Sequence, residues 1–481
     1  MQPIDDQQTS GAGWAGLATG LVLFTAMLLA DAPAGLPLQA WRTAACMVLM
    51  ATWWITEAIP IPATALLPLA LFPLLGVATI GNAASPYANP VIFLFLGGFV
   101  IARALERCGL HRRIALTVVG AVGTKRSRII GGFMLATALL SMWVSNTATV
   151  VMMLPMALSV IAIAERDAPD PQLAVASLLG IAYAANIGGM GTLIGTPPNA
   201  LLAGYMSETW HVEIGFGRWM LLGVPLVAIS LPLVWLLLVN VLHPQRPGEL
   251  AGGAAMIRDE IEKLGRLSSA EKIVGGITLV VAMAWITRPI LERSLPGLSD
   301  AGIAIAGALL LFIVPVRWRP RDVALEWKDA ESLPWSVLIL FGGGLSLAAA
   351  IQETGLAGAI GGGMSGLRTV PPLVALIVVT AVVVFLTELT SNTATAAALV
   401  PIVAAAAAGF GQDPLTFALP VALAASCAFM LPVATPPNAV VYGSGRMTIR
   451  QMATAGLWVN FLMIALLVVA VRLAGTLLVS G

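Results

Sequence analysis

The chain repeats two short polar sequences inside long apolar runs. The pentapeptide Ser-Asn-Thr-Ala-Thr occupies residues 145–149 and again 391–395. A second sequence, Thr-Pro-Pro-Asn-Ala, follows each copy, at 196–200 and at 435–439. Polar groups and prolines interrupt helices and are costly in apolar surroundings, so two matched pairs of them need one common explanation.

Composition shows what surrounds these interruptions. Of the 481 residues, 58% are hydrophobic and 10% are charged, whereas soluble domains carry about 25% charged residues. Many apolar runs contain about 20 residues, the length that crosses a hydrocarbon layer of roughly 30 Å. The sequence therefore predicts an all-α polytopic membrane protein in a lipid bilayer, with about 11 transmembrane helices plus two re-entrant hairpins. The formal net charge of +1 gives no reason to expect a nucleic-acid partner.

The long polar linker at 243–272 divides the chain into two halves. A tail and helix 1 are expected at 1–37, helices 2–6 at 38–242, and helices 7–11 at 273–481. Each half then crosses the membrane five times in this interpretation. Because five is an odd number, the second half enters from the opposite face and the two halves form an inverted repeat.

Each half contains one interrupted segment that we interpret as a hairpin, an inward one at 129–165 and an outward one at 372–408. The first arm of the first hairpin would be about 24 Å long as a helix, which is short for a full crossing. Two full crossings joined by a tight turn would give the same topology and stay open as an alternative. Before the first hairpin, residues 110–128 predict an amphipathic helix at the level of the headgroups.

The distribution of lysine and arginine predicts the orientation. If both hairpins return to their own side, 19 of the 25 basic residues fall on one side of the membrane. If the first segment crossed only once, the basic loops at Arg128 and Lys272 would lie on opposite faces. The hairpin interpretation therefore places the N-terminus and the linker in the cytoplasm and the C-terminus outside, in the cell inner (plasma) membrane.

The two halves align at an offset of 246 residues, which pairs Gly97 with Gly343 and Asn146 with Asn392. The paired glycines predict close helix packing. Inverted repeats with helices broken at matched positions are typical of transporters that bind their substrate near the middle of the membrane.

The interruptions expose chemical groups that suit two kinds of ligand. Free amides and positive helix ends favour an anion, while carbonyl, hydroxyl and amide oxygens favour a hard cation such as sodium. No Lys, Arg or His lies within several residues of any of the four interruptions. We therefore expect the anion to be held by amides, hydroxyls and neighbouring cations. A single such cluster would more often serve hydrogen bonding between helices.

Glu388 stands in the first arm of the second hairpin, where the first half has Met142. A carboxylate at this depth has two interpretations of similar weight, a proton relay or an acceptor that holds the hairpin. Ser145 and Ser391 could in principle be nucleophiles of an intramembrane hydrolase, but that chemistry needs a base. The chain is not expected to be an enzyme, because its histidines are predicted in loops or interfaces: His111, His211 and His243.

These motifs resemble the divalent anion/sodium symporter family, which carries dicarboxylates, tricarboxylates or sulfate. The resemblance covers nearly the whole chain from helix 2 onward. It rests on both Ser-Asn-Thr motifs and on a run that looks like the family signature: Ser426, Phe429, Pro432, Val433, Ala434, Asn438, Val440 and Val441. The resemblance implies a homodimer in which a transport domain moves against a fixed scaffold, an elevator-type cycle.

The resemblance also implies the binding residues. It assigns a first sodium site to Ser141, Ser145, Asn146 and Gly195. It assigns a second sodium site to Thr387, Thr390, Asn392 and Ala434. It assigns the substrate carboxylates to Ser145, Asn146, Thr147, Thr196, Pro197, Ser391, Asn392, Thr393, Thr435 and Pro436.

The expected function is uptake of a divalent anion driven by co-transported sodium ions. A C4-dicarboxylate such as succinate, malate or fumarate is favoured, because the chain lacks the soluble regulatory domain of some sulfate-type relatives. The alternatives are a sodium-independent dicarboxylate exchanger and a sulfate or citrate symporter. A proton-coupled carrier that uses Glu388 is a further alternative.

Overall fold

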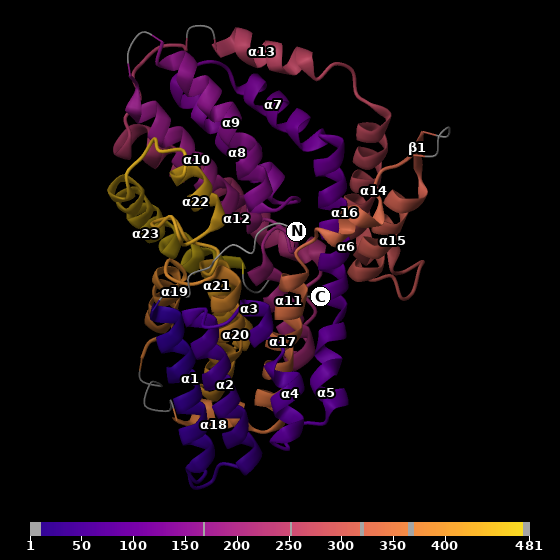
Figure 1. The fold of residues 1–481 in the computed structure, drawn as a ribbon, viewed down its shortest axis with the longest axis vertical. Helices are drawn as coiled ribbons and strands as arrows, with labels where there is room; N and C mark the ends of the chain where they lie inside the picture. The colour runs from indigo at the N-terminus through magenta and orange to yellow at the C-terminus, as the bar shows by residue number, and fades with distance from the viewer. Residues whose placement is uncertain (1–10, 167–168, 251–252, 318–321, 364–369, 475–481) are drawn as a thin grey trace.

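The computed structural model describes residues 11–166, 169–250, 253–317, 322–363 and 370–474 (Figure 1). In these ranges, eight helices are long and apolar enough to cross a membrane by length and composition, and five further apolar helices are shorter. The prediction of an all-α polytopic membrane protein is thereby confirmed. Some predicted features lie outside the described residues, namely the tail at 1–10 and three of the counted basic residues: Arg319, Arg321 and Arg368.

The first half of the chain contains α1 to η2. Helices α1 (Gly11–Leu29) and α2 (Leu38–Thr56) pack against each other. The elements that follow are α3 (Ile61–Thr64), α4 (Leu67–Leu74), α5 (Ile80–Ala84), η1 (Ser85–Ala88), α6 (Pro90–Cys108), α7 (Leu110–Val122), α8 (Arg126–Ser141), α9 (Asn146–Ala164), α10 (Pro171–Gly189), α11 (Pro197–Trp210), α12 (Phe216–Leu236) and η2 (Leu237–Leu242).

The second half contains α13 to α23 and the one strand pair in the described residues. Its elements are α13 (Gly253–Lys263), α14 (Ser269–Leu291), α15 (Asp300–Ile313), β1 (Pro315–Arg317), β2 (Asp322–Val323), α16 (Trp327–Glu331), α17 (Trp335–Glu353), α18 (Leu356–Gly363), α19 (Pro372–Thr387), α20 (Asn392–Gly409), α21 (Pro414–Ala424), α22 (Pro436–Tyr442) and α23 (Ile449–Ala474). Strands β1 and β2 pair antiparallel.

The hairpin helices of the two halves match in position and length. Helices α8 and α19 both have 16 residues, and α9 and α20 begin at Asn146 and Asn392. All these starting points keep the 246-residue offset of the sequence repeat. In Figure 1 α8 and α9 lie in the upper half of the molecule, while α19 and α20 lie lower. This arrangement supports the predicted repeat.

Glycines allow the close helix packing that the sequence predicts. A Cβ atom on Gly97 of α6 would lie 2.6 Å from the carbonyl carbon of Ala304 in α15. A Cβ atom on Gly343 of α17 would collide with the backbone of Ala65, next to α3. Helices approach at these two points because no side chain separates their backbones.

Several boundaries differ from those that the sequence predicts. Helix α7 ends at Val122 because Gly123 adopts φ 95°, so the basic residues Arg126 and Arg128 belong to α8. The linker at 243–272 contains the helix α13, which the sequence analysis did not predict. Strands β1 and β2 were also not predicted.

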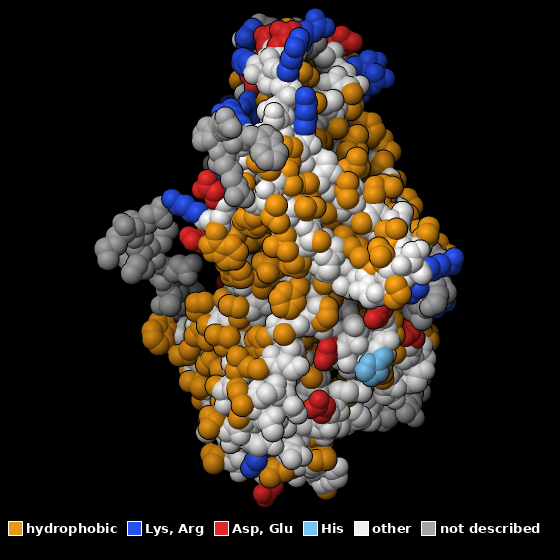
Figure 2. Space-filling view, turned by 90° about the vertical axis from the view of Figure 1, so that its right-hand side faces the viewer, with side chains coloured by type: hydrophobic (Ala, Val, Ile, Leu, Met, Phe, Trp, Pro, Cys, Tyr) orange, Lys and Arg blue, Asp and Glu red, His pale blue; other side chains and the backbone are white. Residues whose placement is uncertain are grey.

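Charged residues tie α7 to α13 and α14. Arg113 Nε lies 2.7 Å from Glu271 Oε1, and Arg112 Nη2 lies 2.9 Å from Glu260 Oε2. A hydrogen bond from Lys263 lowers the pKa of the Glu260 carboxyl, and Arg112 adds to this effect. Figure 2 shows charged side chains gathered at the end where Figure 1 places α13, with apolar side chains over much of the remaining face.

Candidate functional site

The two hairpin tips and the two helix breaks line one cavity of about 1390 Å³. All the residues predicted for the substrate lie on its wall. So do three further residues that are predicted for the sodium sites: Gly195, Thr390 and Ala434. The remaining two predicted sodium ligands, Ser141 and Thr387, end α8 and α19 and are 0% exposed.

The first hairpin tip forms because its serine caps the helix that follows. Ser145 Oγ accepts a hydrogen bond from Ala148 N at 3.1 Å, which satisfies one free amide at the start of α9. Thr192 Oγ1 donates to the carbonyl of Met142 at 2.5 Å and joins the tip to the first helix break. The positive end of α9 therefore lies at the cavity wall.

Each break is spanned by the asparagine of its Thr-Pro-Pro-Asn sequence. Asn199 Nδ2 donates to the carbonyls of Gly189 and Thr192, at 3.1 and 2.8 Å. In the second break, Asn438 makes the same contact: its Nδ2 donates to the carbonyls of Ala428 and Leu431, at 3.2 and 3.0 Å. The sequence analysis missed this bridging role for Asn199 and Asn438, although both belong to the repeated motif.

The breaks also begin earlier than predicted. Proline was expected to interrupt the helices at 196–198 and 435–437, but it occupies the first two positions of α11 and α22. Proline is compatible with the first turn of a helix, since the amide that it lacks has no partner there. The nonhelical stretches are instead residues 190–196 and 425–435.

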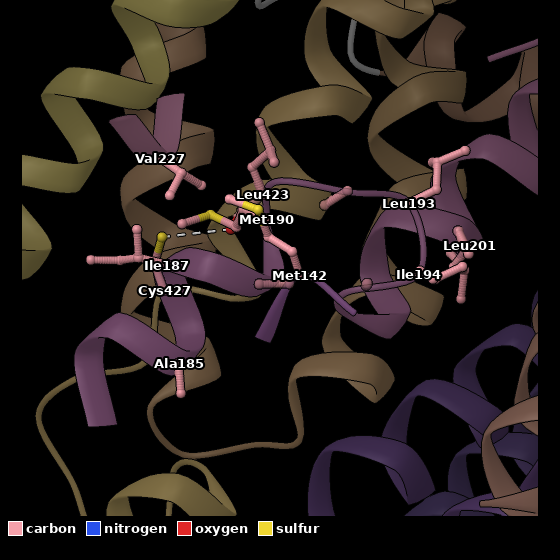
Figure 3. Packing of buried hydrophobic residues seen from close by; sticks show 14 of the residues in the cluster. Met142, Ala185, Ile187, Met190, Leu193, Ile194, Leu201, Val227, Leu423 and Cys427 are labelled. Atoms are coloured by element: carbon pink, nitrogen blue, oxygen red, sulfur yellow. Dashed lines mark hydrogen bonds between the residues drawn. The ribbon is translucent and has the colours of Figure 1, made fainter. Parts of the chain in front are cut away.

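Direct contacts join the first break, and α10 before it, to the second break. Thr196 Oγ1 lies 3.4 Å from Ser426 Oγ, and Asn186 Nδ2 donates to the carbonyl of Ala428 at 2.9 Å. Figure 3 shows part of the buried apolar cluster around the first break, to which Met190 and Leu423 belong. The breaks therefore form one packed unit.

Two oxygens of the first predicted sodium site lack partners. Ser141 Oγ and Asn146 Oδ1 are buried, and neither has a hydrogen-bond partner among the described residues. In the second site, Thr387 Oγ1 lies 2.8 Å from both Asn392 Oδ1 and the carbonyl oxygen of Ala425. The single hydroxyl proton of Thr387 cannot satisfy both acceptors, so this cluster keeps an oxygen that is not fully hydrogen-bonded. Both clusters therefore present neutral oxygens that fit a hard monovalent cation. Ala425 was not predicted as part of this group.

Fewer backbone amides are free than the sequence suggested. The paired prolines remove the first two amides of α11 and α22. In the second break, the N–H groups of residues 429–431 already donate to Glu388. The breaks therefore offer fewer amides to an anion than the sequence suggested, most clearly in the second break.

The cavity wall carries few charges. Among the described lining residues, the charged ones are Glu57, Arg103 and Glu106. Arg103 Nη1 lies 3.1 Å from Glu106 Oε2, so these two side chains form an ion pair on α6. The lining residues of the tips and breaks are all uncharged, in agreement with the sequence.

Comparison with known proteins identifies the family. The family model of the sodium:sulfate symporter transmembrane region matches residues 12–480. The chain belongs to this family. The resemblance seen in the sequence motifs is thereby confirmed, and the family is one of transporters rather than enzymes.

Relatives and solved structures agree with this family assignment. The chain is 44% identical over 467 residues to the sodium-dependent dicarboxylate transporter SdcS of Staphylococcus aureus strain USA300, covering 95% of this chain and 90% of SdcS. The fold is similar to the YdaH transporter of Alcanivorax borkumensis, with a TM-score of 0.60 at 16% identity, covering 92% of this chain and 98% of YdaH. It is also similar to MtrF of Neisseria gonorrhoeae, with a TM-score of 0.57 at 14% identity, covering 95% and 96% of the two chains.

Proposed function

We propose that this protein is a sodium-dependent dicarboxylate transporter that couples inward sodium flow to uptake of a C4-dicarboxylate such as succinate, malate or fumarate. The observation that carries this proposal is the convergence of both tips and both breaks on one cavity with uncharged walls at those four places. The 44% identical relative whose printed name states sodium-dependent dicarboxylate transport supports it.

The carboxylates of the substrate meet the two hairpin tips. They accept hydrogen bonds from the hydroxyls and amides at the starts of α9 and α20, where the helix ends are positive. Sodium ions held by Ser141 and Asn146 on one side, and by Thr387 and Asn392 on the other, supply the remaining positive charge. Coupling follows because the anion and the cations share the two tips, so each stabilises the binding of the other.

The hairpins and broken helices form the moving unit of this proposal, and the protein works as a homodimer in an elevator-type cycle. The N-terminus is cytoplasmic and the C-terminus outside, in the cell inner membrane. If the sodium charge imported exceeds the charge of the substrate, the membrane potential drives uptake by about 2.3 kcal/mol per net charge per 100 mV.

Succinate uptake into liposomes tests the proposal. Purified protein is reconstituted, and uptake of labelled succinate is compared with sodium outside and with choline outside. We expect uptake only with sodium, and competition by malate and fumarate more than by sulfate or citrate. Equal rates in sodium and choline would favour the sodium-independent exchanger and reject symport.

A further inference from the structure

The carboxylate of Glu388 is enclosed by hydrogen-bond donors. It follows the last residue of α19, and the residue is 3% exposed. Oε1 accepts from Phe429 N at 2.7 Å and from Asn460 Nδ2 at 2.8 Å. Oε2 accepts from Leu431 N at 3.2 Å, and Met430 N lies within 3.0 Å of both oxygens. One side chain therefore binds three consecutive backbone amides and α23.

Each of these partners is a hydrogen-bond donor. Three are backbone N–H groups, which can only donate, and the fourth is the side-chain amide of Asn460. No basic side chain in the described part of the chain forms an ion pair with Glu388. Glu388 therefore holds the loop and α23 through hydrogen bonds.

Glu388 holds the loop that carries ligands of the proposed second sodium site. The break at 425–435 supplies the carbonyl of Ala425, which contacts Thr387 Oγ1, and also contains Ala434. Asn438 binds the carbonyl groups of this loop, and Glu388 binds its amides. The loop is thus fixed through both kinds of backbone group, directly beside Thr387.

The first half of the repeat has no such anchor. Met142 stands at the position that corresponds to Glu388. Its backbone carbonyl accepts from Thr192, and its side chain packs against Gly191 but offers no carboxylate to the amides of the break. The oxygens of the proposed first site, on Ser141 and Asn146, have no partner among the residues described. The two halves therefore differ in how far their oxygen clusters are organised before an ion binds.

We propose that Glu388 is a positioning residue that builds the second sodium site in advance, whereas the first site becomes ordered only with its ion. This inference rests on the proposed sodium-coupled function. Glu388 acts through the loop and does not itself bind sodium or substrate.

Replacement by glutamine tests this role. Glu388→Gln replaces one carboxylate oxygen with an NH2 group, which cannot accept the hydrogen bonds that Met430 N and Leu431 N donate to that oxygen. We expect the sodium concentration for half-maximal succinate uptake to rise at least about tenfold, because these partly buried backbone donors lose that acceptor. Vmax at saturating sodium should fall much less.

Double mutants distinguish positioning of one site from a general loss of structure. Glu388→Gln combined with Thr387→Val should raise the half-saturating sodium concentration by less than the product of the single effects, since both act on the second site. When Glu388→Gln is combined with Ser141→Ala, which acts on the first site, the two fold increases in half-saturating sodium should multiply. If the fold increases multiply in both double mutants, Glu388 does not act on the second site.

Two further variants control for folding. Asn460→Ala removes one donor to Glu388 and keeps the carboxyl group with its backbone contacts, so we expect a rise of about two- to fivefold in half-saturating sodium. Asp413→Asn alters another carboxylate that binds backbone amides, at the start of α21 and away from the cavity, and should leave sodium activation unchanged.

The results separate failure of this inference from failure of the function. Wild-type sodium activation in both Glu388→Gln and Asn460→Ala would overturn the positioning role alone. If Glu388→Gln abolishes the dependence of succinate uptake on pH but keeps wild-type sodium activation, Glu388 is a proton relay and not a positioning residue. A wild-type protein that takes up succinate without sodium would overturn the function and this inference together.

Discussion

Replacement of Ser141 should change the free energy of unfolding in opposite directions without and with sodium. Its hydroxyl is fully buried and has no partner among the described residues. An unsatisfied buried polar group costs about 1–3 kcal/mol. Ser141→Ala should therefore stabilise the sodium-free protein, by about 1 kcal/mol, although it removes a proposed sodium ligand.

The effect reverses when sodium binds. A ligand present at 100 times its Kd stabilises the folded state by about 2.7 kcal/mol. If the loss of one ligand weakens sodium binding tenfold, the variant loses about 1.3 kcal/mol of that stabilisation. The variant should thus be more stable than the wild type in choline and should gain clearly less than the wild type on adding sodium.

Thermal unfolding of the purified protein in detergent, in choline and in sodium, measures both effects. Thr137→Val is the matched control, because Thr137 lies one turn earlier on α8 and its hydroxyl is also buried without a partner in the described chain. Thr137→Val should keep the full sodium-induced shift. If Ser141→Ala also keeps the full shift, Ser141 is not a sodium ligand.

Three further predictions concern the tips, the breaks and the packing. Asn146→Ala and Asn392→Ala should each raise the half-saturating concentrations of sodium and of succinate together, because both side chains lie in a tip and in a proposed sodium site; uptake kinetics measure this. Asn199→Ala leaves two carbonyls of the first break without a donor and should lower the unfolding free energy by about 1–3 kcal/mol. Gly343→Ala should cost about 1–3 kcal/mol by forcing α17 away from its neighbour, whereas Gly358→Ala, with open space around it, should not destabilise.

Each of these predictions has an outcome that contradicts it. A change in succinate affinity with normal sodium activation would remove Asn146 or Asn392 from its sodium site. Wild-type stability of Asn199→Ala would mean that the break does not depend on its bridging side chain. Equal unfolding temperatures for Gly343→Ala and Gly358→Ala would show that the close approach at residue 343 tolerates a methyl group.

The hairpins could be located from the sequence because their signals are local. Serine before Asn146 and Asn392 marks the start of a helix, and the same pentapeptide marks both starts. The cavity residues followed from the repeat, since one explanation had to serve all four polar interruptions. Close packing at Gly97 followed from the same alignment.

Other features depend on contacts between distant segments, which local patterns do not specify. The donors to Glu388 lie 41 to 72 residues further along the chain. The sequence alone therefore could not decide whether Glu388 is a proton relay or a hydrogen-bond acceptor. The start of each break was misplaced because proline marks the first turn of the next helix and not the end of the previous one. Helix α18 was missed because it is rich in glycine and forms through packing against α20.

A structure determined with sodium and succinate bound tests the central claim most directly. The account predicts succinate between the starts of α9 and α20, with sodium ions at Ser141–Asn146 and Thr387–Asn392 and with no lysine or arginine nitrogen in contact with the substrate. Succinate bound to the guanidinium of Arg103, or no ion at either oxygen cluster, would contradict it.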